Sequence, residues 1–310
     1  MLFRSESAFE MGFDHIALCA GAGRPTVIPM KNGLARGVRQ ASDFLMALQL
    51  TGAAKANSIA NLQIRMPVVV IGGGLTAIDT ATESMAYYVV QVEKFLARYE
   101  ALAAEKGEAT VRASWNPEET ETANEFLEHA KAIRAERAAA AKEGRQPNFV
   151  PLLNSWGGVT LAYRRRLIDA PSYTLNHEEV NLAMQEGIRF AEGLTPKEVE
   201  LDQHGHALAL HVTNAAGEPQ RLPARAILVA AGTQPNTVLA REDESNVFLD
   251  GKWFQTVNED GQPVKPEKVA KPMNPTVLMN IRPDGRAISF FGDLHPSYAG
   301  DRKSTRLNSS

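Results

Sequence analysis

The pattern of apolar and polar residues predicts a parallel β-sheet with helices between its strands. Four consecutive β-branched residues, Val68 to Ile71, lie between a proline and a glycine, which is typical of a strand buried on both faces. Other short apolar runs end in glycine or in a basic cluster and predict further strands, over 13–22, 158–163, 188–191, 226–232 and 287–293. We therefore expect an α/β fold.

Apolar residues at three- and four-residue spacing predict the helices. One covers 41–48, and another runs from about Thr76 to Gly107, roughly 45 Å at 1.5 Å per residue. Asn116 and Pro117 are a start signal for a second long helix that ends near Lys142. Because a sheet cannot cover helices of this length, we interpret 86–155 as an inserted helical hairpin. The outer face of this hairpin is either solvated or a docking surface for a partner, and both interpretations stay open.

The remaining segments are shorter. A helix closed by glycine is predicted over 177–187, and apolar runs separated by turns over 197–222 predict a small antiparallel meander.

Three glycines join the strand at 68–71 to the long helix. Gly72, Gly74 and Ala77 fit the spacing G-x-G-x-x-A. The first glycine permits a tight turn, the second lets a pyrophosphate approach the backbone, and the small third residue lets the helix pack on the strand. The helix N-terminus adds free N–H groups and partial positive charge. The motif predicts a dinucleotide-binding turn, with a purely structural glycine turn as the alternative.

The next predicted strand ends in three arginines. An NAD-specific unit carries an acid there, which binds the ribose 2′-hydroxyl. Here Arg164 and Arg165 stand instead, followed by Arg166, and arginine pairs bidentately with a 2′-phosphate. The position favours NADP over NAD, the alternative being a basic strand end without a ligand.

The amino-acid composition excludes several kinds of site and ligand. The chain has 310 residues and a formal net charge of -3, which gives no reason to invoke nucleic acid or an anionic membrane, and we expect a cytoplasmic protein. Cys19 is the single cysteine, so an internal disulfide, a Cys-x-x-Cys pair and an iron–sulfur cluster held wholly by this chain are excluded. We expect Cys19 to be buried and inert, and expect a hairpin rather than a metal site at His204, His206 and His211.

Taken in order, these motifs resemble the flavin-dependent pyridine nucleotide oxidoreductases. Within them, the chain is similar to the small subunit of NADPH-dependent glutamate synthase and its larger multidomain relatives. The resemblance covers most of residues 13–300 outside the hairpin. It is carried by six motifs, at 19–22, 69–79, 162–165, 176–179 with 186–187, 230–236 and 291–293.

The resemblance implies a Rossmann-like fold with a nicotinamide domain inserted into an FAD domain. It also implies that hydride passes from NADPH to FAD and that electrons go on to an iron–sulfur or flavin domain or subunit. No side chain need act as acid or base, because the flavin carries the chemistry.

Carried over to this sequence, the resemblance implies the following cofactor-binding residues. NADPH pyrophosphate would lie on the motif Gly72, Gly73, Gly74, Leu75, Thr76, Ala77 and Asp79, in which Leu75 replaces the family's usual asparagine. The 2′-phosphate would lie on Arg164 and Arg165, and the nicotinamide near Gly232 and Gln234. FAD would lie near Ala20, Gly21, Ala22, Gly292 and Asp293.

The same resemblance gives the domain organisation. We expect a partial FAD domain in two segments, 1–65 and 237–300, around an NAD(P)H-binding domain at 66–236. The family's FAD fingerprint does not precede residue 13, and 301–310 has the character of a non-native tail, so we expect a fragment truncated at both ends.

Two other readings remain open. One is a non-catalytic, nucleotide-binding scaffold that uses the 86–155 hairpin as an interaction module, and the other is a complete single-nucleotide dehydrogenase.

Overall fold

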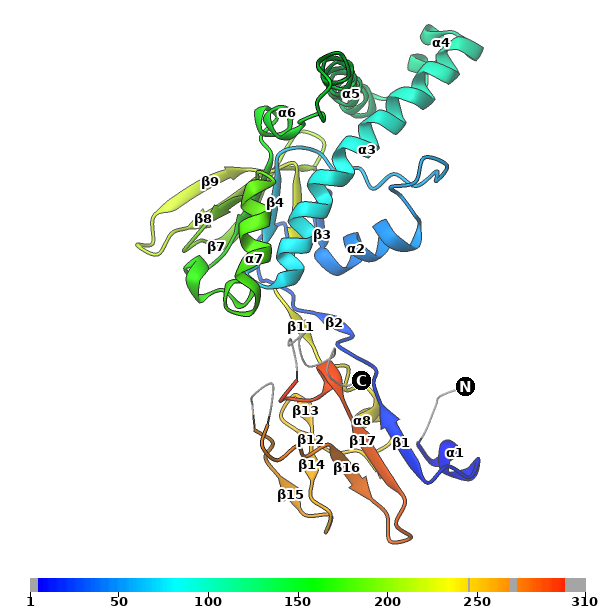
Figure 1. The fold of residues 1–310 in the computed structure, drawn as a ribbon, viewed down its shortest axis with the longest axis vertical. Helices are drawn as coiled ribbons and strands as arrows, with labels where there is room; N and C mark the ends of the chain where they lie inside the picture. The colour runs from blue at the N-terminus through cyan, green and yellow to red at the C-terminus, as the bar shows by residue number, and fades with distance from the viewer. Residues whose placement is uncertain (1–4, 245, 268–271, 299–310) are drawn as a thin grey trace. The chain divides into compact units, whose positions relative to one another are not determined.

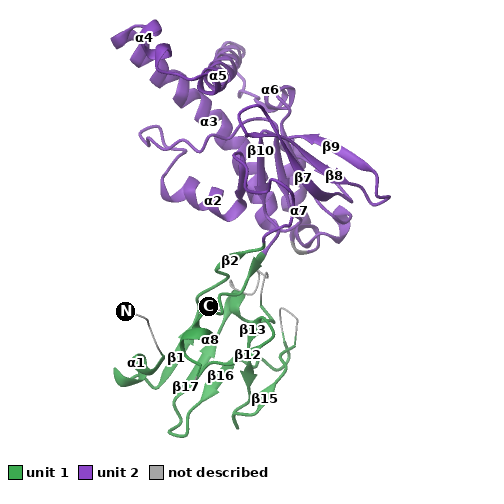
Figure 2. Cartoon of the chain, turned by 180° about the vertical axis from the view of Figure 1, so that it is seen from behind, with its two compact units in different colours: residues 1–26, 233–310 green, residues 27–232 purple. Residues whose placement is uncertain are grey.

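The computed structural model describes residues 5–244, 246–267 and 272–298, and the chain divides into two compact units. Unit 1 comprises residues 1–26 and 233–310, and unit 2 comprises residues 27–232 (Figure 2). The first boundary therefore falls after Thr26 rather than at the expected 65/66, because 27–65 supplies a strand and a helix to unit 2. The second falls at 232/233 instead of 236/237. The expected tail, 301–310, lies outside the described residues.

Unit 2 is built on a five-stranded sheet in which all neighbouring strands are parallel, as the apolar runs predict. In spatial order the strands are β3 (Val38–Gln40), β10 (Ala226–Val229), β4 (Val68–Ile71), β5 (Val159–Ala162) and β6 (Arg189–Ala191). Every residue of β4 and β10 is buried. The α/β fold is thus confirmed.

The two faces of this sheet are covered differently (Figure 1). Because side chains alternate along a strand, Val68 and Val70 pack in one apolar cluster and Val69 and Ile71 in another. The first cluster contains the helices α2 (Ala41–Leu50), α3 (Leu75–Lys106) and α7 (Pro171–Gln185). The second contains the predicted meander, an antiparallel sheet of β7 (Thr195–Leu201), β8 (Ala207–Thr213) and β9 (Pro219–Pro223).

The helical hairpin predicted over 86–155 is present. It consists of the outer part of α3 with α4 (Glu108–Ala113), α5 (Pro117–Glu143) and α6 (Val150–Ser155). The predicted start of α5 carries a full capping box between Asn116 and Glu119. Arg134 pairs with Glu100 at 2.8 Å and Arg137 with Glu93 at 2.6 Å, which fixes α5 antiparallel to α3.

An aromatic cluster joins the hairpin to the body of unit 2. The His129 ring of α5 stacks on Trp156 with 3.7 Å between ring centroids. Its Nδ1 also lies 2.6 Å from the hydroxyl of Tyr88, which is fully buried on α3. Burial disfavours the charged imidazolium and lowers the pKa of His129 to about 4, against a smaller opposing effect of Glu128.

We predict that low pH destabilises the packing of the hairpin on the body of unit 2. The unfolded chain protonates His129 near pH 6.5, whereas the folded chain does so only near pH 4, so the free energy of unfolding falls as pH drops through this window. Because the side chain is only partly buried, we expect an effect on the order of 1 kcal/mol. Urea unfolding at several pH values checks it. His129→Phe keeps an aromatic ring and should flatten the pH slope, and an unchanged slope in this variant would contradict the assignment.

Unit 1 holds a second five-stranded sheet, with β1 (His15–Leu18), β17 (Ala287–Phe290), β16 (Leu278–Ile281), β14 (Thr256–Val257) and β15 (Pro263–Val264) in spatial order. Its smaller elements are α1 (Ser5–Glu10), β2 (Arg24–Pro25), β11 (Thr233–Gln234), α8 (Leu239–Glu242), β12 (Leu249–Asp250) and β13 (Trp253–Phe254).

The expectation of a buried Cys19 is wrong. The strand β1 ends at Leu18, and Cys19 follows it as an exposed residue. Within the described ranges, no helix has the length and apolar content required to cross a membrane.

Candidate functional site

Three loops of unit 2 meet at the carboxyl edge of its parallel sheet. The strand β4 lies between β10 and β5, and Ile71 pairs in register with Val229 on one side and Ala162 on the other. The segments that follow these strands, 72–76, 163–165 and 230–232, therefore leave the sheet side by side. Ligands of open α/β sheets bind at this edge.

The three consecutive glycines have different surroundings. A Cβ on Gly72 would lie 2.4 Å from the carbonyl oxygen of Ala230, and one on Gly73 would lie 2.3 Å from the Tyr163 ring. A Cβ on Gly74 would meet nothing within 4 Å. None of the three has a positive φ. The first two glycines are thus required by close packing rather than by a special turn conformation, while Gly74 faces open space, as the pyrophosphate hypothesis requires.

The start of α3 supplies N–H groups at this open space. The amides of Leu75 and Thr76 in the first turn have no intrahelical acceptor, and Gly74 at the N-cap has no side chain that could accept from them. Thr76 is exposed, whereas Ala77 is fully buried, which allows α3 to approach the sheet. Asp79 lies half-buried one turn further along α3. The aligned peptide dipoles favour an anion at this point.

The structure separates the three arginines that follow β5. Arg166 forms an ion pair with Asp169, with 2.9 Å between Nε and Oδ2, and this contact lowers the pKa of Asp169. Arg164 and Arg165 are exposed, and no hydrogen bond or ion pair reaches either guanidinium from the part of the chain that the structure describes. Two cations therefore remain available beside the glycine loop.

Two residues to which the sequence gives no role shape this edge. The Tyr163 ring covers Gly73, and the carboxylate of Glu192, directly after β6, accepts the Leu167 N–H at 2.8 Å. The Gly193 N–H donates to the carbonyl of Arg165 at 3.2 Å. These contacts hold the arginine loop, residues 163–167, at Arg165 and at Leu167. Glu192 lies outside any motif, so no sequence signal identifies it.

Unit 1 has a comparable edge of its own. The strands β1 and β17 are parallel with Leu18 opposite Phe290, and the Phe291 N–H donates to the Leu18 carbonyl at 3.0 Å. The residues predicted to contact FAD follow these two strands, and the structure brings them to one edge: Ala20, Gly21, Ala22, Gly292 and Asp293.

The two residues predicted near the nicotinamide fall in different units. Gly232 is the last residue of unit 2, whereas Gln234 lies in β11 of unit 1 and donates to the Thr26 hydroxyl at 3.2 Å.

This fold and site define a class of dinucleotide-binding α/β protein. Residues 3–267 match the family model described as pyridine nucleotide-disulphide oxidoreductase, and the chain belongs to this family. The family is one of flavoprotein oxidoreductases that use FAD and NAD(P)H, which confirms the expected class.

A curated relative is the uncharacterized protein RP006 of Rickettsia prowazekii (strain Madrid E). It is 43% identical over 201 residues, which are 65% of this chain and 26% of the relative, so the chain spans about a quarter of its length.

Solved structures that match the chain include an FAD-dependent pyridine nucleotide-disulphide oxidoreductase from Desulfovibrio vulgaris. Its TM-score is 0.42 at 14% identity, over 91% of this chain and 46% of that one. Thioredoxin reductase from T. acidophilum has a TM-score of 0.45 at 12% identity, over 94% of this chain and 64% of that one.

Substitution of Gly72 and of Gly74 should show which of the two glycines is required for packing. Gly72→Ala places a methyl group against the Ala230 carbonyl and should lower the free energy of unfolding by about 1–3 kcal/mol. Gly74→Ala meets no neighbour and should cost less than about 1 kcal/mol. Urea unfolding of both variants measures the difference. Equal losses would contradict the roles assigned to the two glycines.

Proposed function

We propose that unit 2 binds NADPH at the carboxyl edge of its parallel sheet. The proposal rests on one observation: an open glycine loop lies beside Arg164 and Arg165, which have no side-chain partner among the residues that the structure describes. The loop offers backbone donors for a pyrophosphate. The arginines offer guanidinium groups for the phosphate that distinguishes NADPH from NADH.

The charges at this edge support a ligand with several phosphates. Asp169 is already paired with Arg166, and the Glu192 carboxylate accepts a backbone N–H of the same loop. The arginine pair, together with the positive end of α3, is thus positioned to receive an anion. NADPH carries one pyrophosphate and one 2′-phosphate, which match these two donor groups in number and kind.

We propose that unit 1 contributes to an FAD site through residues 20–22 with Gly292 and Asp293. The flavin would supply the hydride chemistry when bound. In unit 2, the glycine loop and the arginines would hold NADPH and Gly232 would lie near its nicotinamide, and no side chain of the chain would act as acid or base.

On this proposal, the chain is the NADPH-binding portion of a flavin-dependent oxidoreductase that passes electrons to an iron–sulfur or flavin partner. This is the arrangement that the resemblance to the glutamate synthase small subunit implies. The family match supports the flavoprotein class, while the partner follows from the resemblance alone.

If Arg164 and Arg165 bind the 2′-phosphate, their removal should abolish the preference for NADPH over NADH. Wild-type protein should bind NADPH more tightly than NADH. The double variant Arg164→Ala with Arg165→Ala should weaken NADPH binding by about 10- to 100-fold, that is about 1.4–2.8 kcal/mol, and leave NADH binding nearly unchanged. Fluorescence titration of the full chain with both nucleotides provides the two Kd values.

Arg166→Ala is the matched control. It removes a neighbouring charge that Asp169 already neutralises, so the ratio of the two Kd values should change less than about threefold. Equal affinity of the wild-type chain for NADPH and NADH would refute the arginine assignment. So would an effect of Arg166→Ala as large as that of the double variant.

The open space at Gly74 leads to a separate expectation. Gly74→Ala keeps the fold but places a methyl group where the pyrophosphate would approach, so both NADPH and NADH should bind at least about tenfold more weakly. The same titration measures it. Unchanged binding of both nucleotides in a correctly folded Gly74→Ala variant would place the pyrophosphate elsewhere.

A further inference from the structure

A cavity of about 630 Å³ lies at the opposite, amino edge of the same parallel sheet. Gly37 and Val38 at the start of β3, and Ala226 at the start of β10, form one side of it. The loop 61–65 and the helices α3 and α5 of the hairpin form the others. Its volume falls within the range of about 300–1,000 Å³ that small-molecule sites occupy.

The hairpin gives this cavity an aromatic wall. Phe95 of α3 and Phe126 of α5 meet edge to face, with 5.7 Å between ring centroids, and Trp115 lies in the turn before α5. Phe126 is almost fully buried, whereas Phe95 and Trp115 are half-buried. Such a wall suits a flat apolar group.

Most charges around the cavity are already compensated. Arg36 pairs with Glu118 at 2.9 Å, and the buried Arg65 pairs with Glu125 and Glu121 of α5. The Glu119 carboxylate accepts the Asn116 N–H at 2.8 Å and so belongs to the cap of α5. These lining contacts leave little charge to attract a ligand.

Arg39 differs from the other lining cations. It is half-buried on β3, and no carboxylate or hydrogen-bond partner reaches its guanidinium within the described ranges. His206, which also lines the cavity, stays uncharged at neutral pH because burial lowers its pKa. Among the lining cations of the described chain, Arg39 is therefore the one without a carboxylate partner.

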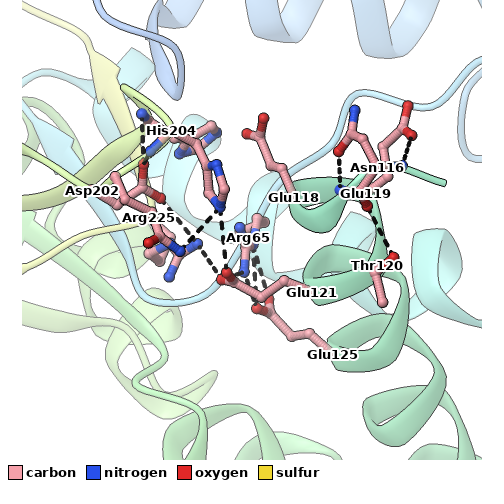
Figure 3. A network of polar contacts seen from close by, with 12 residues as sticks. Arg65, Asn116, Glu118, Glu119, Thr120, Glu121, Glu125, Asp202, His204 and Arg225 are labelled. Carbon is pink, nitrogen blue, oxygen red and sulfur yellow. Dashed lines mark hydrogen bonds and ion pairs between the residues drawn. The ribbon is translucent and has the colours of Figure 1, made fainter.

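A polar network holds the cavity in shape. Glu121 of α5 accepts from Arg65 at 3.1 Å and from Arg225 at 3.0 Å, and Arg225 also reaches Asp202 at 3.5 Å (Figure 3). Helix α5 is thus connected both to the loop that precedes β4 and, through Arg225 and Asp202, to the meander. Removing one partner of a buried pair such as Arg65 is costly, so these contacts resist collapse of the helix onto the sheet.

We infer that this cavity binds a small organic anion with a flat apolar body, its charged group on Arg39 and its body against Phe95, Trp115 and Phe126. The cavity reaches Ala226 and Leu228 of β10, whereas the glycine loop contacts Ala230, so about 7 Å of strand lies between the two, and no residue of 72–76, 163–165 or 230–232 lines the cavity. The inferred site is therefore distinct from the nucleotide site, and both can be filled together.

The test uses 1-anilinonaphthalene-8-sulfonate with the full chain, because this aromatic anion has a planar naphthalene ring and its fluorescence rises in apolar surroundings. We expect saturable binding of one molecule per chain. Arg39→Gln should weaken it at least tenfold, and Arg39→Lys should weaken it less. Thr122→Trp fills the cavity from α5 and should abolish it. Arg166→Gln, an exposed charge removed at the other edge, is the matched control and should leave binding unchanged.

NADPH titration of the same variants is the second measurement, and its Kd should stay within about twofold of wild type, which also verifies folding. Absence of saturable binding to the wild-type chain would overturn the inference. Binding that persists unchanged in Arg39→Gln or in folded Thr122→Trp would overturn it as well, because the probe would then lie elsewhere.

Discussion

The close parallel packing of β4 between β10 and β5 is the constraint on which the rest of unit 2 depends. It brings the backbone after β4 so near to Ala230 and Tyr163 that Gly72 and Gly73 leave no room for a side chain. Because neighbouring strands are parallel, everything that follows them is delivered to one edge. The sheet therefore brings the glycine loop, the arginine loop and the end of β10 to the same edge.

The long helix α3 connects the two edges of that sheet. Its first turn presents free amides beside the glycine loop, and its outer part carries the hairpin to the amino edge. Buried charge is concentrated at the amino edge, where Arg65 and Arg225 share Glu121, and such groups cost free energy unless they are paired. At the carboxyl edge, Arg164 and Arg165 are exposed and have no ion-pair partner among the described residues. This contrast is what separates a structural polar network from a candidate anion site.

Local signals predicted a large part of this organisation. The apolar run at 68–71, the glycine spacing and the start of α5 at Asn116 are encoded within a few residues, and each lies where the pattern places it. The three residues of β3 show no periodicity, and their place beside β10 is fixed by pairing across about 190 residues of sequence, so the first unit boundary was predicted too late. The pairing of Arg166 with Asp169, the anchor at Glu192 and the cavity beside Arg39 depend on contacts between distant segments or on rotamers, which sequence spacing does not specify.

Hydrogen–deuterium exchange of the full chain with and without NADPH tests the central claim most directly, because it reports which backbone amides the nucleotide covers. We predict protection confined to peptides that contain residues 72–77 and 163–167, since both loops lie at the carboxyl edge of the sheet. Protection at the amino edge around residues 36–39 and 115–126, or no protection at either edge, would contradict the account.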